Sequence, residues 1–349
     1  MLQPIKVGIK PREVSQSLLK QVENKRVREV LEKRFGLKNE GKETLEAIGK
    51  SYGITRERVR QIESDGLKLL ARPAVYGLAE SVFAALEEHL REHGGVAKNE
   101  QLYQSLATEK DHPHIEFLLT VGKQFQKARE TEEAHGTWFA DKNAKSTADK
   151  IIAGAVLGLE EKKTPVSRAE MLDILAAEAE KVLGHKPKEP ALLAYLGVSK
   201  LIGQNPYGEY GLVSWPTIHP KGVRDKAYIV LAKSGKPMHF REVAEAINKM
   251  AWTKKPAHHQ TVHNELIKAS SRFVLVGRGL YALREWGYTP GTVADVMQSV
   301  LKDAGQPMAR EEIVRQVLEK RFVKENTILL NLQNRSIFGR NAEGRYHLV

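Results

Sequence analysis

The sequence contains no cysteine, and no part of it approaches the length of apolar chain that crosses a membrane. Without cysteine the chain has no disulfides, thiolate metal ligands, iron–sulfur clusters or cysteine nucleophiles. A spanning helix needs about 20 consecutive apolar residues, and the amino-terminal segment MLQPIKVGIKPREV lacks the apolar core of a secretion signal. These absences predict a cytoplasmic protein with no membrane partner.

The sequence also lacks the motifs of common catalytic sites. It has no GxxxxGK[ST] phosphate loop, no GxGxxG after an expected strand and no GxSxG elbow, and its carboxylates form no paired constellation. His259 and His263 stand one turn apart on an expected helix beside His258, but neither an HExxH pattern nor a third ligand accompanies them. We therefore expect no enzymatic activity, no cofactor and no metal site.

Acidic residues are fewer than basic residues in this chain. The chain has 349 residues, and its 55 Lys and Arg against 43 Asp and Glu give a formal net charge of +12. This excess favours an anionic partner such as nucleic acid, although a basic protein without that partner would have the same composition. Residues 1–75 contain 17 basic and 10 acidic side chains, whereas residues 76–145 contain 8 and 12. DNA contact is therefore expected to begin at the amino terminus.

The clearest motif is the run TLEAIGKSYGITRERVRQIE, from Thr44 to Glu63. Its spacing predicts a short helix, a turn at Gly53 and a second helix that begins after Thr55. Glycine permits the left-handed conformation that this turn requires, and threonine is a good N-cap. This is the pattern of a helix-turn-helix. The apolar residues expected to pack between its helices are Leu45, Ile48, Ile54, Val59 and Ile62.

The outer face of the second helix carries side chains that can bind base edges. With Val59 and Ile62 turned inward, the outer residues near its amino-terminal end are Arg56, Glu57, Arg60 and Gln61. Arginine can bind guanine, glutamate can accept from cytosine N4, and glutamine can pair with adenine. A charged helical face is often only solvated, but a glutamate among three arginines favours base reading in the major groove.

The longer string RFGLKNEGKETLEAIGKSYGITRERVRQIE resembles region 4 of bacterial primary sigma factors, the module that reads the promoter −35 element. The resemblance covers residues 12–75, and TRERVRQIE is a highly specific string within it. It implies that Arg56, Glu57, Arg60 and Gln61 meet bases and nearby backbone, and that the module docks on the flap of the RNA polymerase β subunit. It also implies a set of residues that lie toward the DNA backbone: Arg26, Arg34, Thr44, Leu45, Glu46, Thr55 and Arg58.

Two features set this chain apart from that family. The family continues its recognition helix with Ala-Lys-Ala, whereas this chain has Ser64-Asp65-Gly66. An acid thus replaces a phosphate-binding lysine, and a glycine enters a helix interior at a cost of about 1 kcal/mol, so weaker or altered −35 preference is expected. Residues 76–349 contain no counterpart of the family's −10-melting helix or main polymerase-clamp contact. The chain is therefore not a complete sigma factor.

A repeat of roughly 70 residues follows this segment. Each copy ends in a Gly-x-aromatic step: Gly136-Thr-Trp138, Gly208-Glu-Tyr210, Gly279-Leu-Tyr281 and Gly344-Arg-Tyr346. An apolar trio precedes each step: Ile115/Leu119/Phe125, Leu192/Leu196/Ile202, Val262/Leu266/Phe273 and Ile328/Leu332/Phe338. The second helix of each copy opens with a similar string: GVAKNEQL, PVSRAEML, PMHFREVA and PMAREEIV.

Each copy therefore predicts three helices and a hairpin whose first strand ends at the last apolar residue of the trio and whose second strand carries the aromatic residue. That is a winged helix. The predicted fold is mainly α with small β-hairpins, in which a helix-turn-helix domain is followed by four tandem winged-helix units. The predicted boundaries are 1–75 for the helix-turn-helix and 76–142, 143–219, 220–288 and 289–349 for the winged helices.

The third copy, KPMHFREVAEAINKMAWTKKPAHHQTVHNELIKASSRFVLVGRGLYAL, resembles the HARE-HTH family of winged helices. The residues that carry this match are Pro256, Thr261, Val262, Leu266, Phe273, Gly277, Gly279, Tyr281 and Leu283. The resemblance implies DNA contact or protein docking. The side chains expected to form a second DNA surface, unless they are only solvated, are Lys254, Lys255, His258, His259, Arg272 and Arg278.

Together these observations predict a nucleoid-associated, sequence-specific transcription factor that reads a −35-like element of double-stranded DNA and contacts RNA polymerase through the β flap. Two alternatives remain open. One is a polymerase-independent nucleoid protein or the DNA-binding arm of a modification or defence system. The other is an inhibitor that competes with a sigma factor for the β flap. The sequence leaves open the oligomeric state, the target promoter, the sign of regulation and which winged helices bind DNA.

Overall fold

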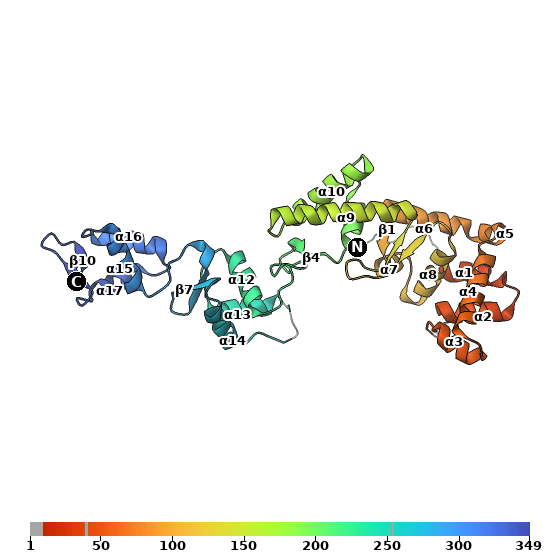
Figure 1. Cartoon of the computed structure of the whole chain (residues 1–349), viewed down its shortest axis with the longest axis horizontal. Helices are drawn as coiled ribbons and strands as arrows, with labels where there is room; N and C mark the ends of the chain where they lie inside the picture. Colours follow the sequence, from red (N-terminus) through yellow and green to blue (C-terminus); the bar gives the residue numbers. More distant parts are fainter. Residues whose placement is uncertain (1–9, 39–40, 251, 253–254) are drawn as a thin grey trace. The chain divides into compact units, whose positions relative to one another are not determined.

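The computed structural model describes residues 10–38, 41–250, 252 and 255–349. They form two compact units (Figure 1): the first runs to residue 203 and includes 208–213, and the second comprises 204–207 and 214–349. Among the described residues, no single helix is long and apolar enough to cross a bilayer; one sharply bent pair, Arg56–Leu70 with Pro73–Glu92, passes that length and composition test jointly.

The first unit begins with the predicted helix-turn-helix. Its helices are α1 (Pro11–Lys20), α2 (Lys25–Phe35), α3 (Leu45–Tyr52) and α4 (Arg56–Leu70). Thr44 and Thr55 cap α3 and α4 with their hydroxyl groups, and Gly53 adopts the left-handed conformation between them, with φ of 65°. The five apolar residues predicted between the helices all lie in one cluster, in which Ile48, Val59 and Ile62 are buried. The helix-turn-helix prediction is confirmed.

Gly66 lies where α4 crosses α2. A β-carbon at this position would come 2.8 Å from a methyl group of Val27 and 3.0 Å from one of Leu31. Glycine at this position lowers helix propensity, but its small size also permits the close approach of the two helices. Its low helix propensity could be anticipated from the sequence, whereas this packing requirement could not.

A three-stranded winged helix completes the amino-terminal part of the first unit. Short helices α5 (Pro73–Tyr76) and η1 (Gly77–Ala79) lead into it, and a turn of 3₁₀-helix, η2 (Glu109–Asp111), precedes its third helix. Its helices are α6 (Glu80–Glu92), α7 (Asn99–Leu106) and α8 (His112–Val121). Its strands β1 (Val96–Lys98), β2 (Gln126–Ala128) and β3 (Thr137–Phe139) pair antiparallel in the order β1-β3-β2.

Three further copies have the same order of three helices and a hairpin, and in the second and fourth an isolated bridge takes the place of the strand before the second helix. The second has α9 (Lys142–Lys162), α10 (Arg168–Leu183), α11 (Glu189–Val198), β4 (Ile202–Gln204) and β5 (Tyr210–Leu212). The third has α12 (Val223–Ser234), β6 (Met238–His239), α13 (Phe240–Lys249), α14 (His259–Lys268), β7 (Phe273–Gly277), β8 (Leu280–Leu283) and η3 (Arg284–Trp286). The fourth has α15 (Val293–Ala304), α16 (Arg310–Lys320), α17 (Glu325–Leu332), β9 (Phe338–Arg340) and β10 (Tyr346–Leu348).

In every copy the repeated aromatic residue pairs with the residue just before the N-cap of the second helix. Its strand pairs with the short extended segment that precedes the second helix, so each wing is attached to the helical core of its own copy. The four pairs are Ala97 with Trp138, Val166 with Tyr210, Met238 with Tyr281 and Met308 with Tyr346. This shared register explains why the Gly-x-aromatic step and the opening of the second helix recur together in the sequence.

The predicted position of the first strand in each wing is wrong. The sequence predicts strands that end at Phe125, Ile202, Phe273 and Phe338. Three of these residues instead begin their strands, and β2 begins at the residue after Phe125. All four side chains are buried. Each packs inward where the chain leaves the third helix, and the strand then extends away from that anchor.

The third helices of the first two winged helices are buried by neighbouring parts of the first unit. Helix α8 packs against α1 and α2, with the rings of Phe35 and Phe117 edge to face at 5.3 Å. Helix α11 packs against β1, and the hydroxyl of Tyr195 donates to the carbonyl of Gly94 over 3.0 Å. In the second unit, buried Arg321 donates to the carbonyls of Leu275 and Thr289 and so connects the third and fourth winged helices.

Polar contacts reinforce the interface between the helix-turn-helix and α8. The Ser15 hydroxyl lies 2.5 Å from Nδ1 of buried His114, and burial lowers the pKa of this imidazole. Glu116 is bonded by Lys42 and, over 2.7 Å, by Lys127. Burial would raise the pKa of Glu116, but these two lysines outweigh it and hold the pKa below its ordinary value. Glu116 belongs to α8, and its carboxylate is therefore charged at neutral pH and keeps α8 paired with Lys42 of the helix-turn-helix.

The crossing at Gly66 yields a stability prediction. We expect Gly66→Ala to lower the free energy of unfolding by about 1 kcal/mol, because overpacking against Val27 and Leu31 outweighs the better helix propensity of alanine. Gly158→Ala in α9 is the matched control, since its β-carbon would meet only Ile174, at 3.4 Å. Urea titration followed by circular dichroism measures both variants. A stabilised Gly66→Ala chain would show that the crossing tolerates a methyl group.

Candidate nucleic-acid interface

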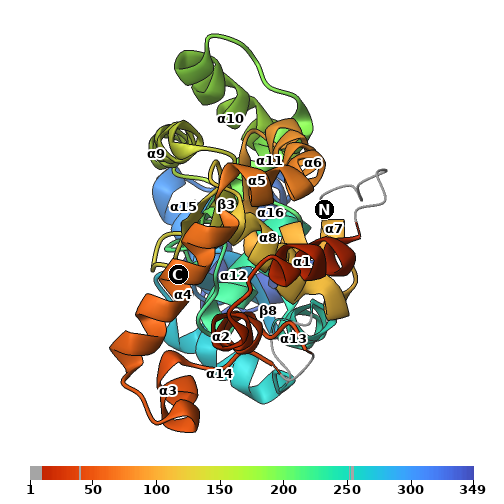
Figure 2. The same cartoon turned by 90° about the vertical axis from the view of Figure 1, so that its right-hand side faces the viewer.

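The outer face of α4 presents all four predicted base-reading residues to solvent. Arg56, Glu57, Arg60 and Gln61 are exposed, whereas Val59 and Ile62 on the opposite face are buried. The Thr55 hydroxyl accepts from the backbone N–H of Arg58 over 3.2 Å and fixes the start of the helix. In Figure 2, α3 and α4 extend from the rest of the helix-turn-helix at the lower left. This geometry leaves the amino-terminal half of α4 open to a partner.

Side chains on this face are paired with one another in the free protein. Arg60 donates to both carboxylate oxygens of Glu57, over 2.8 and 2.7 Å, and Arg58 donates to the Gln61 amide oxygen over 3.1 Å. The hydrogen bond between these two side chains lowers the pKa of the Glu57 carboxyl group and raises the pKa of the Arg60 guanidinium. More than half of each side chain in the Glu57–Arg60 pair is exposed, so solvent screens the pair and a ligand can open it at little cost.

The residues expected at the DNA backbone fall into three groups. Arg26, Glu46 and Arg58 are exposed, and the Arg26 guanidinium lies 5.2 Å from the centre of the Tyr52 ring. Arg34 is half-buried: it donates to the carbonyl of Glu43 over 3.1 Å, and its Nε lies 3.3 Å from a Glu63 oxygen. The other three stand at helix starts: Thr44, Leu45 and Thr55. Of these, Leu45 also packs against the core.

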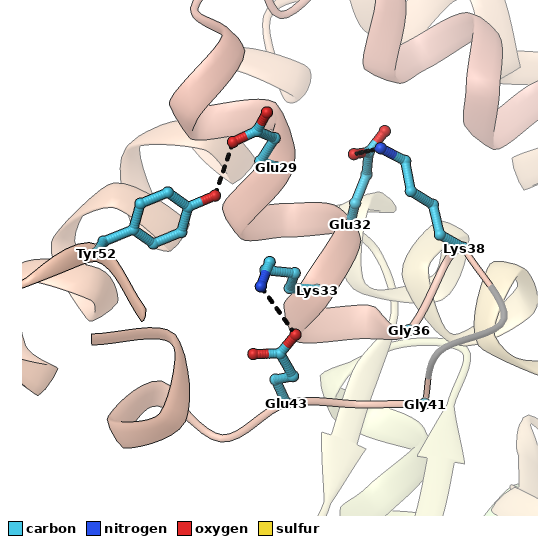
Figure 3. Close-up of a pocket in the computed structure, with 8 residues that line it drawn as sticks. All are labelled: Glu29, Glu32, Lys33, Gly36, Lys38, Gly41, Glu43 and Tyr52. Carbon is cyan, nitrogen blue, oxygen red and sulfur yellow. Dashed lines mark hydrogen bonds and ion pairs between the residues drawn. The ribbon is translucent and has the colours of Figure 1, made fainter. Parts of the chain in front are cut away.

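A pocket between α2, α3 and the segment that joins them is held together by side-chain contacts (Figure 3). The Tyr52 hydroxyl donates to Glu29 over 2.7 Å, Lys33 pairs with Glu43 at 3.1 Å, and Lys38 pairs with Glu32 at 2.6 Å. Burial and the bond to Glu29 raise the pKa of Tyr52 to about 12. The pocket is lined by three glutamates and two lysines, and this excess of negative charge makes it unsuited to phosphate. We interpret its side-chain contacts as those that fix α3 on α2.

A second groove lies beside α4, and no pattern in the sequence pointed to it. Lys68 of α4 and Lys123, which follows α8, both line this groove together with Arg60. Lys123 lies in the segment of the chain with an acidic excess, so charge counting directed attention away from it. Only the packing of α8 on the helix-turn-helix brings the two lysines to the same groove.

The structure separates the residues predicted as a second DNA surface in the third winged helix. Lys254 lies outside the described residues. Lys255, His258 and His259 are exposed near the start of α14, with the two imidazole rings stacked at 4.3 Å. Arg278 is exposed in the turn between β7 and β8. Arg272 is half-buried elsewhere in this winged helix, where it bonds Asp225 over 2.8 Å and covers the Tyr228 ring.

Helix α14 differs from α8 and α11 in what it leaves exposed. Only Val262 and Leu266 of α14 are buried, and its outer side presents Gln260, Asn264 and Lys268 to solvent. The Gln260 amide donates to the Asn264 amide oxygen over 3.4 Å. Six of the ten residues of α8 and five of the ten residues of α11 are buried. Of these three helices, α14 is therefore the one with the open polar face that base reading requires.

One group of metal-ligand type was not anticipated from the sequence. His89, Glu92 and His93, at the carboxyl-terminal end of α6, place ligand atoms within 4.8 Å of one another. However, His89 Nε2 bonds the Ser105 hydroxyl at 3.0 Å, and His93 Nδ1 bonds the His89 carbonyl at 2.7 Å. Burial, with His93 nearby, lowers the pKa of His89 to about 4. The two imidazoles already have hydrogen-bond partners within the fold, and we assign no metal to this group.

Comparison with known families supports both resemblances noted in the sequence. Residues 24–72 match the family model described as Sigma-70, region 4. Residues 223–286 match the HARE-HTH model, a helix-turn-helix domain whose description includes restriction endonucleases. The first match includes α2, α3 and α4, and the second includes the third winged helix. Both families are DNA-binding helix-turn-helix domains, so two segments of this chain are similar to DNA-binding domains, and one of the two is similar to a domain of sigma factors.

Curated relatives match over the same amino-terminal region. The RNA polymerase sigma factor RpoS of Coxiella burnetii is 57% identical over 47 residues, which are 14% of this chain and 13% of that protein. The RNA polymerase sigma factor RpoD of Helicobacter pylori is 51% identical over 59 residues, 17% of this chain and 9% of that protein. The chain thus matches only a small part of the length of these relatives.

Proposed function

We propose that this protein is a sequence-specific transcription factor that reads a −35-like promoter element through α4. The observation that carries the proposal is the exposed face formed by Arg56, Glu57, Arg60 and Gln61 on a capped helix. This face lies within the segment that matches sigma region 4. A recognition helix inserts its amino-terminal residues into the major groove, and those are the residues that α4 leaves open.

Binding would exchange contacts within this face for contacts to bases. In the free protein Arg60 holds Glu57, and Arg58 holds Gln61. On DNA, Arg60 would turn to guanine O6 and N7, Glu57 to cytosine N4 and Gln61 to adenine. The pairing keeps these side chains near their binding positions in the free protein. It also provides each of these polar groups with a hydrogen-bond partner until a base replaces that partner.

The start of α3 would bind the neighbouring backbone. The N–H groups of Leu45 and Glu46 lie in the first turn of α3, where backbone donors and the helix dipole favour an anion. Thr44 and Thr55 hold the two helix starts, and Arg26 and Arg58 extend exposed cations. Arg34 would act mainly by fixing α2 to Glu43 and Glu63. These contacts would set the position of α4 on the duplex without specifying its sequence.

Substitutions at Arg60 and Arg26 separate base reading from backbone binding. We expect Arg60→Ala to weaken the free energy of binding to the preferred site by about 1–3 kcal/mol and to change binding to scrambled DNA little. The ratio of the affinities for the two duplexes would therefore fall. Arg26→Ala should weaken both duplexes alike and reduce the salt slope by about 1. Fluorescence anisotropy at several salt concentrations, with a site selected from random DNA by the wild-type chain, measures both. Equal losses on the two duplexes for Arg60→Ala would argue against direct readout.

RNA polymerase is the protein partner we propose, with docking on the β flap. The support is the match to sigma region 4 and the named relatives, which are RNA polymerase sigma factors. We expect the full chain to retain core polymerase from a nuclease-treated extract. Failure to retain it, with DNA binding intact, would favour a polymerase-independent nucleoid, modification or defence protein. Retention combined with loss of sigma-dependent transcription in vitro would favour an inhibitor of the β flap.

The third winged helix would supply a second DNA contact through α14. Gln260 and Asn264 are exposed on its outer side, and amide side chains can bind adenine in bidentate fashion. The stacked His258 and His259 at the start of α14 and Arg278 in the wing would lie toward the backbone. The first two winged helices cannot offer the same contact, because α8 and α11 are largely buried.

A paired substitution tests this second contact. We expect Gln260→Ala combined with Asn264→Ala to weaken binding to a long selected duplex by roughly tenfold or more, as lost base contacts cost about 1–3 kcal/mol each. Binding to a short duplex that covers only the −35-like element should not change. The control is Glu325→Ala combined with Asn326→Ala, exposed residues at the start of α17. An unchanged affinity for the long duplex would remove α14 from the DNA interface.

A further inference from the structure

The groove beside α4 has walls from two different domains. One wall is the carboxyl-terminal half of α4, and the other is the end of α8 with the turn that follows it. The residues that line the groove are Arg60, Glu63, Ser64, Leu67, Lys68, Ala71, Thr120, Val121 and Lys123. Arg60, Ser64, Leu67 and Ala71 follow at intervals of four, three and four residues, and Lys68 lies four residues after Ser64, so they share one side of α4 and its carboxyl-terminal end. The groove therefore begins on the base-reading face and follows α4 away from its amino-terminal end.

The two walls are held together by a shared core. Leu70 of α4, Phe35 of α2 and Phe117 of α8 are buried in the same apolar cluster. The Lys42–Glu116 contact adds a polar link across the same interface. Lys123 is only two residues beyond the end of α8. Its position relative to the recognition helix is therefore set by packing within one compact unit and not by a flexible linker.

Among the described residues, Lys123 is the cation of this groove that no carboxylate neutralises. Arg60 is paired with Glu57, Lys68 lies 3.8 Å from Asp65, and Glu63 is paired with Arg34. For Lys123, no ion pair is found within the part of the chain that the structure describes, and its ammonium group lies 5.6 Å from the centre of the Tyr76 ring. The side chain is exposed. A solvent-facing ammonium group is thus held beside α4 by a domain that is acidic elsewhere.

We infer that the first winged helix contributes Lys123, together with Lys68 of α4, to a binding site for the DNA phosphate backbone beside the recognition helix. This inference rests on the proposed function of α4. A helix in the major groove has a sugar–phosphate strand along each side, and the half of the helix that leaves the bases passes close to one of them. Asp65 would repel that strand. Lys68 offsets this charge, and Lys123 supplies the net attraction.

The inferred contact gives the first winged helix a role that its fold alone does not suggest. Its third helix is covered by α1 and α2 and cannot enter a groove of its own. It acts instead as an extension of the helix-turn-helix that adds one sequence-independent phosphate contact. Such a contact raises affinity for every sequence alike and contributes to the salt dependence of binding.

The first test measures DNA binding by the full chain with Lys123→Ala. The probes are a duplex selected from random DNA by the wild-type chain and a scrambled duplex of the same composition. We expect roughly threefold to tenfold weaker binding to both, and a slope of log K against log salt that is smaller by about 0.9. The control is Lys110→Ala, an exposed lysine of the same winged helix that does not line the groove. Lys123→Arg should restore binding.

Two results would overturn the inference: an unchanged salt slope for Lys123→Ala, or an equal loss for Lys110→Ala. Neither result affects the proposed function, which is measured separately by the preference of the wild-type chain for its selected duplex and by the loss of that preference in Arg60→Ala. If the wild-type chain shows no preference while Lys123→Ala still reduces the salt slope, base reading is wrong and the phosphate contact stands.

A second test locates Lys123 on the DNA. Because the chain has no cysteine, Lys123→Cys provides a single attachment point for an iron–EDTA reagent that cleaves nearby DNA. We expect cleavage of the selected duplex at one edge of the sequence that α4 protects. The same reagent on Lys110→Cys should give much weaker cleavage. Cleavage absent at position 123, with the site still protected, would place the DNA away from this groove and contradict the inference.

Discussion

The packing of α8 against α1 and α2 is the contact on which the first unit depends. It buries the third helix of a winged helix, the element that would otherwise be available for DNA, and joins two domains in one apolar core. Burial of that helix removes water from apolar side chains on both partners, which is the main favourable contribution to such an interface. Helix α4 consequently has a fixed neighbour, and the groove between α4 and the end of α8 exists only because this contact forms.

The same structural position serves different purposes along the chain. In the first two winged helices the third helix is apolar over most of its surface: α8 reads HPHIEFLLTV and α11 reads EPALLAYLGV. In the third winged helix the corresponding helix reads HQTVHNELIK and buries only two side chains. A winged helix can therefore be a packing element or a DNA-binding element, and the composition of its third helix decides which role is open to it.

The charged side chains of the helix-turn-helix form local pairs of opposite sign and not one broad positive patch. Glu57 with Arg60, Asp65 with Lys68 and Glu63 with Arg34 each pair an acid with a base on or beside α4. Such pairs keep the free surface nearly balanced. Under the proposed function, DNA would have to provide a specific replacement for each partner, and a wrong base would leave a charge without a partner. Selectivity can therefore arise from side chains that are already engaged in the free protein.

The helix-turn-helix, its inward and outward faces, the two family resemblances and the four-fold repeat could all be predicted from the amino-acid sequence. These are local properties: a glycine at the turn, a threonine at each cap and apolar residues at helical spacing specify structure within a few turns of chain. The effect of distant segments on one another became visible only in the folded chain. There Gly66 lies at a helix crossing, Arg272 is paired with Asp225, and Lys123 lies beside α4. No local pattern contains this information, because each case depends on which face of one element packs against another far away in the sequence.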